Sequence, residues 1–279
     1  MTGADTVAGA AAPAPSRLAG AFARARAEGR TALVPFLTAG YPTLDESEEL
    51  FAALARGGAD AIEIGVPFSD PLADGATIQR TSERAIANGV SLGDCLALAG
   101  RLRARGVTQP LVLMGYYNPI LRYGVERFAA ESAAAGADGF IVPDLPTEES
   151  EELLAACRAN GRDLIFLLAP TSTEARIASV AERASGFIYC VSLTGVTGGR
   201  AELPDLRPYL ARVRAKTDLP LAIGFGISSP EQVRQVGAVA DGAIIGSALI
   251  DAIDRAPAGE APAAAEAFMR RLAEGAVRG

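Results

Sequence analysis

The chain has 279 residues, of which 49% are hydrophobic, and a formal net charge of −7. This acidic balance argues against nucleic acid as a partner, because a phosphate backbone requires a basic face. The sequence contains no run of roughly 18 apolar residues, so no membrane span is predicted. It also contains no histidine and one lysine, Lys216, which excludes an imidazole base, a Ser-His triad and a histidine metal site.

The first 16 residues are rich in alanine and proline and lack the basic and leucine-rich regions of a secretion signal. We expect them to be a flexible tail ahead of one domain over residues 17–279. Cys95, Cys157 and Cys190 are widely spaced and odd in number, which argues against a disulfide framework and a zinc site. These features predict a cytoplasmic protein without a bound metal.

Short apolar runs alternate with helical segments along the chain. The runs are apolar throughout, as is typical of parallel strands buried on both faces. They cover residues 32–39, 61–66, 111–116, 139–144, 163–169, 186–192, 221–227 and 242–248. The predicted helices cover 44–55, 77–87, 92–105, 124–135, 148–160, 173–184, 206–215 and 230–236, with a tail helix over 263–274.

A weak repeat supports one architecture. The segments GADAIEIG at Gly58, GADGFIVPD at Gly136 and VADGAIIGS at Val239 each place Ala-Asp before an apolar run, which indicates a reused helix-to-strand junction. The eight strand–helix units of about 30 residues predict an α/β fold, a (β/α)8 TIM barrel with extra helices at both termini. An open doubly wound sheet ordinarily uses fewer strands. Functional residues are then expected where the strands end.

The segment IEIGVPFSDPLADGATIQ, residues 62–79, contains two candidate acid–base residues. Glu63 alternates with Ile62 and Ile64, so it faces the barrel interior if the isoleucines pack against helices. A carboxyl group there is desolvated and suited to proton transfer; a structural carboxylate paired with Arg or Tyr is the alternative. Asp74 precedes Gly75, and an Asp-Gly pair in a loop is typical of a structural turn. Asp74 belongs to the same strand–helix unit as Glu63, however, so both side chains can reach the same end of the barrel.

Glycine-rich segments follow three consecutive late strands: SLTGVTGGR from Ser192, GFGISSP from Gly224 and IIGSA from Ile244. Backbone N–H groups and helix N-termini at such loops commonly bind phosphate in this fold. Tight turns without a ligand remain the alternative. Aromatic and apolar residues at strand ends favour a small aromatic or apolar phosphate ester as the substrate. The Tyr189 hydroxyl needs a hydrogen-bond partner if it is buried, and Glu63 can supply one. Lys216 lies before a strand, on the opposite face, which argues against Schiff-base chemistry.

Five motifs together resemble the tryptophan synthase alpha subunit family. They are residues 62–79, YNPI at Tyr117, VPDLPTEES at Val142, SLTGVTG at Ser192 and GFGISSPEQV at Gly224. The resemblance runs in order from about residue 33 to 250. The common form of the first motif has proline where this chain has Ala76, a position without chemistry.

The resemblance implies retro-aldol cleavage of indole-3-glycerol phosphate to indole and glyceraldehyde 3-phosphate. It assigns Glu63 as the acid and base, Asp74 to the indole N–H, and Tyr189 to a place beside Glu63. The remaining implied positions are Phe36, Met114, Tyr116 and Ile141 for the indole pocket, Gly198, Gly226, Gly246 and Ser247 for phosphate, and Thr197 for loop closure.

The resemblance also implies a partner, the pyridoxal-phosphate-dependent beta subunit, in an alpha2beta2 heterotetramer, with no cofactor in this chain. Asp70, Pro71, Asn118 and Pro146 match the contact surface. Two other hypotheses stay open: another phosphate-binding barrel enzyme, such as an isomerase or synthase, and an inactive chain that only binds and activates the beta subunit.

Overall fold

The structure, a computed structural model, describes residues 16–192, 205–224 and 226–277. Its strands are β1 (Ala32–Thr38), β2 (Ile62–Gly65), β3 (Leu111–Met114), β4 (Gly139–Ile141), β5 (Asp163–Ile165), β6 (Leu167–Leu168), β7 (Ile188–Val191), β8 (Leu221–Gly224) and β9 (Gly242–Ile245). Its helices are α1 (Arg17–Ala27), α2 (Leu44–Arg56), α3 (Ala76–Ala87), α4 (Leu92–Ala104), α5 (Tyr117–Tyr123), α6 (Val125–Ala134), α7 (Glu151–Ala159), α8 (Glu174–Arg183), α9 (Arg207–Arg214), α10 (Pro230–Gly237), α11 (Ser247–Asp254) and α12 (Ala261–Ala273), with a 3-10 turn, η1, over Thr147–Glu149. The predicted flexible tail falls almost wholly on residues 1–15, outside the described residues.

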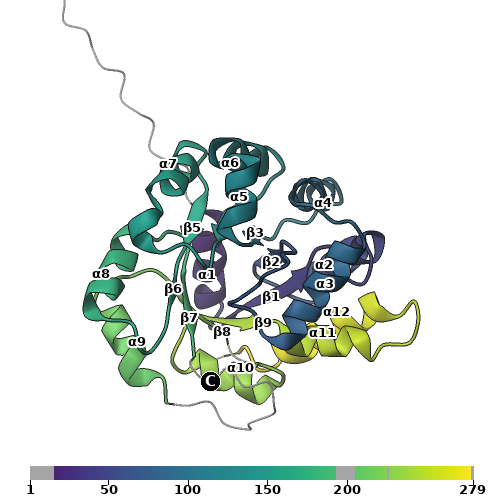
Figure 1. Cartoon of the computed structure of the whole chain (residues 1–279). Coiled ribbons are helices and arrows are strands. Elements are labelled where there is room, and N and C mark those ends of the chain that lie inside the picture. Colours follow the sequence, from purple (N-terminus) through teal and green to yellow (C-terminus); the bar gives the residue numbers. More distant parts are fainter. Residues whose placement is uncertain (1–15, 193–204, 225, 278–279) are drawn as a thin grey trace, which may run out of the picture.

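The strands form one parallel sheet that curves into a barrel surrounded by helices (Figure 1). The hydrogen-bonded order runs β5-β4-β3-β2-β1-β9-β8-β7-β6. The two end strands, β5 and β6, are consecutive parts of one run that is interrupted at Phe166. The run therefore pairs with β4 through its first part and with β7 through its second. The predicted (β/α)8 barrel is confirmed, with its fifth strand divided in two.

Most predicted helices begin and end within about two residues of the observed ones. The segment predicted as one helix over 148–160 is η1 followed by α7, and the short helices α5 and α11 were not predicted. Helix α5 begins at Tyr117, directly after the predicted apolar run 111–116, and α11 begins at Ser247, inside the predicted run 242–248. No helix in the described ranges is long and apolar enough to cross a membrane.

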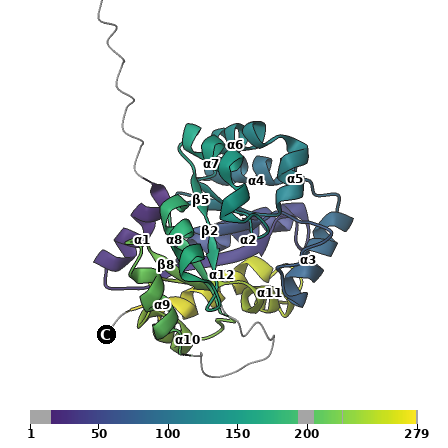
Figure 2. The same ribbon diagram turned by 60° about the vertical axis from the view of Figure 1, so that its left-hand side comes forward.

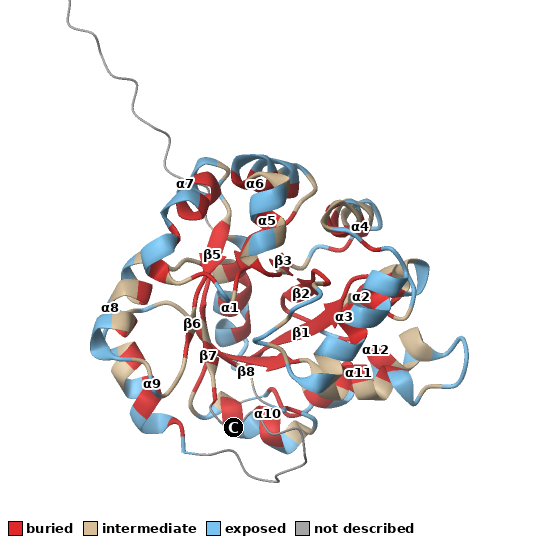
Figure 3. Ribbon diagram, in the orientation of Figure 1, coloured by how far each residue is buried: buried red, intermediate tan, exposed pale blue. Residues whose placement is uncertain are grey.

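Alternation along the strands separates two apolar layers, and nearly every strand residue is buried (Figure 3). Ile62 and Ile64 belong to the outer layer, between the strands and the helices. Residues of opposite parity form the inner layer, which is a separate cluster that includes Val112, Ile141 and Ile165. Glu63 has the parity of the inner layer.

Helix α1 closes the end of the barrel where the strands begin. Its Leu18 and Phe22 join the inner cluster, and two glycines make room for them. A Cβ atom on Gly139 would lie 2.9 Å from Leu18 Cδ1, and one on Gly242 would lie 2.6 Å from Phe22 Cε1. Any larger residue at these positions collides with α1.

The repeated Ala-Asp motif ties neighbouring strands together at this same end. Asp60 accepts a hydrogen bond from the backbone N–H of Leu33 at 2.8 Å, and Asp138 accepts one from Leu111 at 2.8 Å. Asp241 does the same for Leu221 at 2.9 Å. In each case the carboxylate before one strand holds the start of the preceding strand in the barrel, which explains the repeat.

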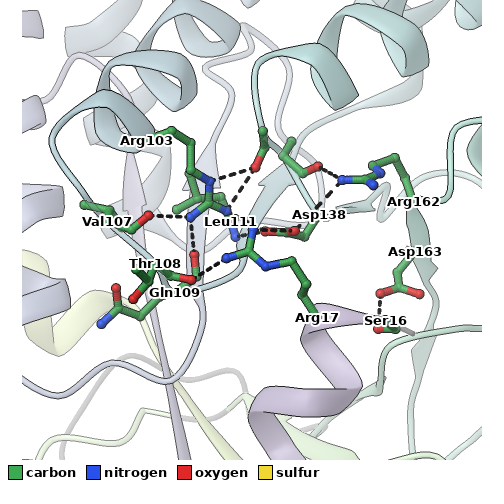
Figure 4. A network of polar contacts seen from close by, with 12 residues as sticks. Ser16, Arg17, Arg103, Val107, Thr108, Gln109, Leu111, Asp138, Arg162 and Asp163 are labelled. Atoms are coloured by element: carbon green, nitrogen blue, oxygen red, sulfur yellow. Dashed lines mark hydrogen bonds and ion pairs between the residues drawn. The ribbon is translucent and has the colours of Figure 1, made fainter. Parts of the chain in front are cut away.

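Arginines neutralise these carboxylates and attach α1 to them, as Figure 4 shows around Asp138. Arg17 of α1 lies 3.0 Å from Asp138 Oδ1, and Arg103 of α4 lies 2.6 Å from Asp138 Oδ2. At the other end of α1, Arg26 pairs with Asp241 at 2.8 Å. Because Asp138 and Asp241 are nearly buried, these pairs satisfy charges that would otherwise be costly.

We predict that Gly242→Ala lowers the free energy of unfolding by about 1–3 kcal/mol, because the added methyl group overpacks against Phe22. Chemical denaturation measures the change, and Gly93→Ala in α4, whose Cβ would have its nearest neighbour at 3.7 Å, is the control. Combining Gly242→Ala with Phe22→Leu should recover part of the loss. If Gly242→Ala alone had the free energy of unfolding of the wild type, the prediction would be wrong, because Phe22 would then move aside without loss of stability.

Candidate active site

Glu63 lies in the barrel interior, near the end where the strands finish. The residue is fully buried, and neither carboxyl oxygen has a hydrogen-bond partner among the described residues. Burial raises the pKa of Glu63 from 4.5 to about 8. The group is therefore protonated at neutral pH, and the alternative of a structural carboxylate paired with Arg or Tyr is wrong for the described part of the chain.

Apolar residues of the inner layer surround this carboxyl group. Phe36 is the register partner of Glu63 on β1, and Val112 is its partner on β3. One step further along the strands, Met114 and Ile141 are paired with each other. Phe36 and Ile141 are buried and Met114 is partly buried. The fold thus brings three predicted indole-pocket residues to the strand ends around Glu63.

Tyr189 of β7 faces the same interior and is partly buried. Burial raises the pKa of Tyr189 well above 10.0, and the charges of Glu63 and Asp74 raise it further. The expected hydrogen bond to Glu63 is absent from the described structure, since both Glu63 oxygens are unpartnered. Tyr189 therefore interacts electrostatically with the two carboxyl groups. Its hydroxyl lies directly over Gly224, where the Cβ atom of any other residue would collide with it.

Asp74 lies in the loop between β2 and α3 and is partly buried. Burial raises the pKa of Asp74 to about 6, and an interaction with the Tyr116 hydroxyl opposes this shift. The same hydroxyl accepts a hydrogen bond from the backbone N–H of Ala73 at 2.9 Å, and the Tyr116 ring stacks on Phe68. Tyr116, predicted for the indole pocket, thus also supports the Asp74 loop.

Gln79 holds this loop from the other side, because its Nε2 donates a hydrogen bond to the backbone oxygen of Asp74 at 2.8 Å. The sequence interpretation did not include Gln79. Its position five residues after Asp74 and one turn into the following helix is the signal that could have indicated a local side-chain contact.

The late strands lead into two helix N-termini. Helix α10 begins at Pro230 after Gly226, and α11 begins at Ser247 with Gly246 as its N-cap. Gly226 has a φ of +35°, a conformation that favours glycine. Gly246 has no side chain to cap the first N–H groups of α11, which leaves them suited to an anion. Thr197 and Gly198, predicted for loop closure and phosphate, lie outside the described residues.

The four predicted partner-contact residues follow three successive strands: Asp70 and Pro71 lie in the loop after β2, Asn118 lies in the first turn of α5 after β3, and Pro146 lies in the loop after β4. Asp70 and Asn118 are exposed, and Pro71 and Pro146 are partly exposed. Leu72, next to Pro71, is 94% exposed and is an apolar residue that the sequence interpretation left out.

Other chemistry finds no support in the described residues. No group of three or more His, Cys, Asp or Glu residues there could hold a metal ion. Lys216 follows α9 and precedes β8, at the end of the barrel opposite to Glu63, as predicted. The chemistry available at the strand ends is that of Glu63, Asp74 and the tyrosines.

Comparisons with known proteins identify the family. The model of the family described as tryptophan synthase alpha chain matches residues 22–276. The tryptophan synthase alpha chain of Roseiflexus sp. (strain RS-1) is 59% identical over 258 residues, which cover 92% of this chain and 99% of the relative. That of Chloroflexus aurantiacus is 52% identical, with 94% of this chain and 99% of the relative covered.

Solved structures show the same similarity. A chain of tryptophan synthase from M. tuberculosis superposes with a TM-score of 0.85 at 40% identity, covering 94% of this chain and 98% of that one. The tryptophan synthase alpha subunit from Legionella pneumophila str. Paris has a TM-score of 0.87 at 36% identity, with coverage of 94% and 98%.

A (β/α)8 barrel that combines the buried carboxyl group of Glu63, the partly buried one of Asp74 and glycine-rich strand ends is typical of an enzyme of the (β/α)8 class. The family match and the identities narrow this class to a single member: the chain belongs to the tryptophan synthase alpha chain family. It is a carbon–carbon lyase of tryptophan biosynthesis, and its reaction is the cleavage of indole-3-glycerol phosphate to indole and glyceraldehyde 3-phosphate.

We predict that Glu63→Gln stabilises the protein at alkaline pH. The pKa of Glu63 is raised on folding, so the stability that this residue contributes is fully present below pH 4.5 and is lost as the pH rises through about 8. The neutral amide avoids this loss. We expect the free energy of unfolding to exceed that of the wild type by about 3–5 kcal/mol at pH 9 and to match it near pH 5. A difference independent of pH, measured by denaturation at both values, would contradict the raised pKa.

Proposed function

We propose that Glu63 is the acid and base of the cleavage and that Asp74 stabilises the indole ring during it. The observation that carries this proposal is the buried, unpartnered carboxyl group of Glu63, with a pKa of about 8. A carboxyl group that is neutral at pH 7 can donate a proton, and its conjugate base, once formed, is strong enough to take one back.

The reaction proceeds in two proton transfers. Glu63 donates its proton to carbon C3 of the indole ring, which becomes a cationic indolenine. The carboxylate of Asp74 accepts a hydrogen bond from the ring N–H and stabilises the positive charge. Glu63 then takes the proton of the glycerol hydroxyl group, the carbon–carbon bond breaks, and its electrons return to the ring. Indole and the aldehyde leave, and Glu63 is again neutral.

Phe36, Met114, Ile141 and Tyr116 form the walls for the indole ring in this proposal. Their burial around Glu63 and Asp74 supports that role. The phosphate group is bound by Gly226, Gly246 and Ser247, together with Gly198, and the uncapped N-terminus of α11 supports this assignment. Thr197 helps to close the site, and Tyr189 lies beside the two carboxyl groups and completes the wall opposite β2.

The chain acts with a tryptophan synthase beta subunit, in an alpha2beta2 heterotetramer located in the cytoplasm. The solved tryptophan synthase of M. tuberculosis is the relative that suggests this assembly. Asp70, Pro71, Asn118 and Pro146 contact the partner, and the adjacent exposed Leu72 adds an apolar contact. This chain needs no cofactor, because pyridoxal phosphate serves the beta subunit, which receives the indole.

We predict that Glu63→Gln lowers indole release by about 10³-fold or more, since the amide can neither donate nor accept the proton. Asp74→Asn should also be severely impaired, because an amide cannot supply the negative charge. The assay measures indole formed from indole-3-glycerol phosphate, with and without a beta subunit.

Glu83→Gln, the same substitution at an exposed position of α3, is the control and should retain activity. Indole release by Glu63→Gln near the wild-type rate would falsify the mechanism. A wild-type chain that releases no indole but activates the beta subunit would favour the inactive-partner hypothesis instead.

We also predict a bell-shaped dependence of kcat/KM on pH. Asp74 must be ionised, so the rate rises as the pH passes through about 6. Glu63 must be protonated in the free enzyme, so the rate falls as the pH passes through about 8. A rate that stays constant from pH 7 to pH 10 would argue against Glu63 as the proton donor.

A further inference from the structure

Three successive residues near the start of α3 contact the two ends of α11 and the Asp74 loop. Ile78 faces the N-cap of α11, where a Cβ atom on Gly246 would lie 3.7 Å from Ile78 Cδ1. Gln79 donates its side-chain hydrogen bond to the backbone oxygen of Asp74. Arg80 reaches the far end of α11, at Asp254. Helices α3 and α11 lie side by side in both views of the molecule (Figures 1 and 2).

Arg80 takes part in a closed ring of hydrogen bonds, which we name the Tyr41–Arg80–Asp254 cluster. Arg80 Nη2 donates to Asp254 Oδ2 at 2.5 Å, and Arg80 Nη1 donates to the Tyr41 hydroxyl at 2.9 Å. The Tyr41 hydroxyl donates in turn to Asp254 Oδ1. The cluster therefore joins the loop after β1 to α3 and α11.

The cluster compensates for an unfavourable position of Asp254. This residue ends α11, whose last turn contains no basic residue, and a negative charge at a helix C-terminus opposes the helix dipole. Arg80 supplies a positive charge from α3, in addition to that of Arg255, the C-cap residue of α11. Tyr41 is only 7% exposed, whereas the Arg80 side chain is 49% exposed, so the buried hydroxyl fixes the geometry of the cluster more than the partly solvated ion pair does.

We propose that Tyr41, Arg80 and Asp254 are positioning residues that fix the Asp74 loop relative to the phosphate-binding end of α11. This inference rests on the proposed roles of Asp74, Gly246 and Ser247. One substrate must reach both places at once, with its phosphate at α11 and its indole N–H at Asp74. The cluster holds α3 against α11, and Gln79 transmits the position of α3 to Asp74. A displacement of about 1 Å at a reacting group can reduce the rate by about 10²-fold.

The test uses Arg80→Met and Tyr41→Phe in the full chain, with three measurements. They are kcat for indole release from indole-3-glycerol phosphate, the dissociation constant of inorganic phosphate, and the midpoint of thermal unfolding. Arg84→Met, an exposed arginine one turn further along α3, is the matched control and should leave all three unchanged.

We expect Arg80→Met to lower kcat by about tenfold while the dissociation constant of phosphate changes by less than about twofold. Tyr41→Phe removes one hydroxyl group without changing charge and should lower kcat by about threefold; it decides the question if Arg80→Met does not fold. A kcat that stays at the wild-type value, with only the unfolding midpoint lowered, would overturn the inference. So would a loss of phosphate affinity as large as the loss of kcat, because the cluster would then only shape the phosphate site.

Failure of the proposed function has a different signature. In that case the wild-type chain itself would release no indole, or Glu63→Gln would remain active. An active wild type with unaffected Arg80→Met and Tyr41→Phe variants would refute the positioning role alone.

Discussion

A carboxyl group buried without a partner is the constraint around which the catalytic end of the barrel is built. Glu63 keeps its raised pKa only while its surroundings stay apolar and offer no cation. The strand register meets this need, because the residues paired with Glu63 are Phe36 and Val112. An arginine at either position would lower the pKa and leave the carboxylate ionised and too weak a base. In the proposed mechanism, the apolar wall is thus part of the acid–base chemistry as well as a surface for an indole ring.

The opposite end of the barrel treats the same kind of side chain differently. Asp60, Asp138 and Asp241 each accept a backbone hydrogen bond and face at least one arginine. They are as buried as many apolar residues, but their negative charge is compensated. One end of the barrel therefore uses carboxylates for stability, while the other leaves Glu63 without a compensating charge, as its proposed acid–base role requires. Environment, and not residue type, separates the two roles.

Patterns of fixed period were sufficient to predict the barrel and the orientation of Glu63, because alternation along a strand determines which side chains face inward. The sequence did not reveal α5 and α11, since both are short; α5 directly follows an apolar run, and α11 begins before the predicted run has ended. It also did not reveal that the Tyr116 hydroxyl meets the backbone of Ala73, a contact between loops that local sequence does not encode. The hydrogen bond expected between Tyr189 and Glu63 was wrong, since both Glu63 oxygens are unpartnered. The sequence indicates that both residues face the barrel interior, but it does not determine where the Tyr189 hydroxyl points.

The position of α1 at the closed end of the barrel limits when the protein can fold during its synthesis on the ribosome. Arg26 of α1 pairs with Asp241, 215 positions later in the chain. The residues just after α1 are also joined to the far end, because the Thr31 N–H donates to the Ala276 oxygen at 2.8 Å. The first helix to be synthesised must therefore wait, with Leu18 and Phe22 uncovered, until almost the whole chain has emerged. The slow contacts of this fold are those between its two ends, and the nascent chain exposes the apolar face of α1 during translation.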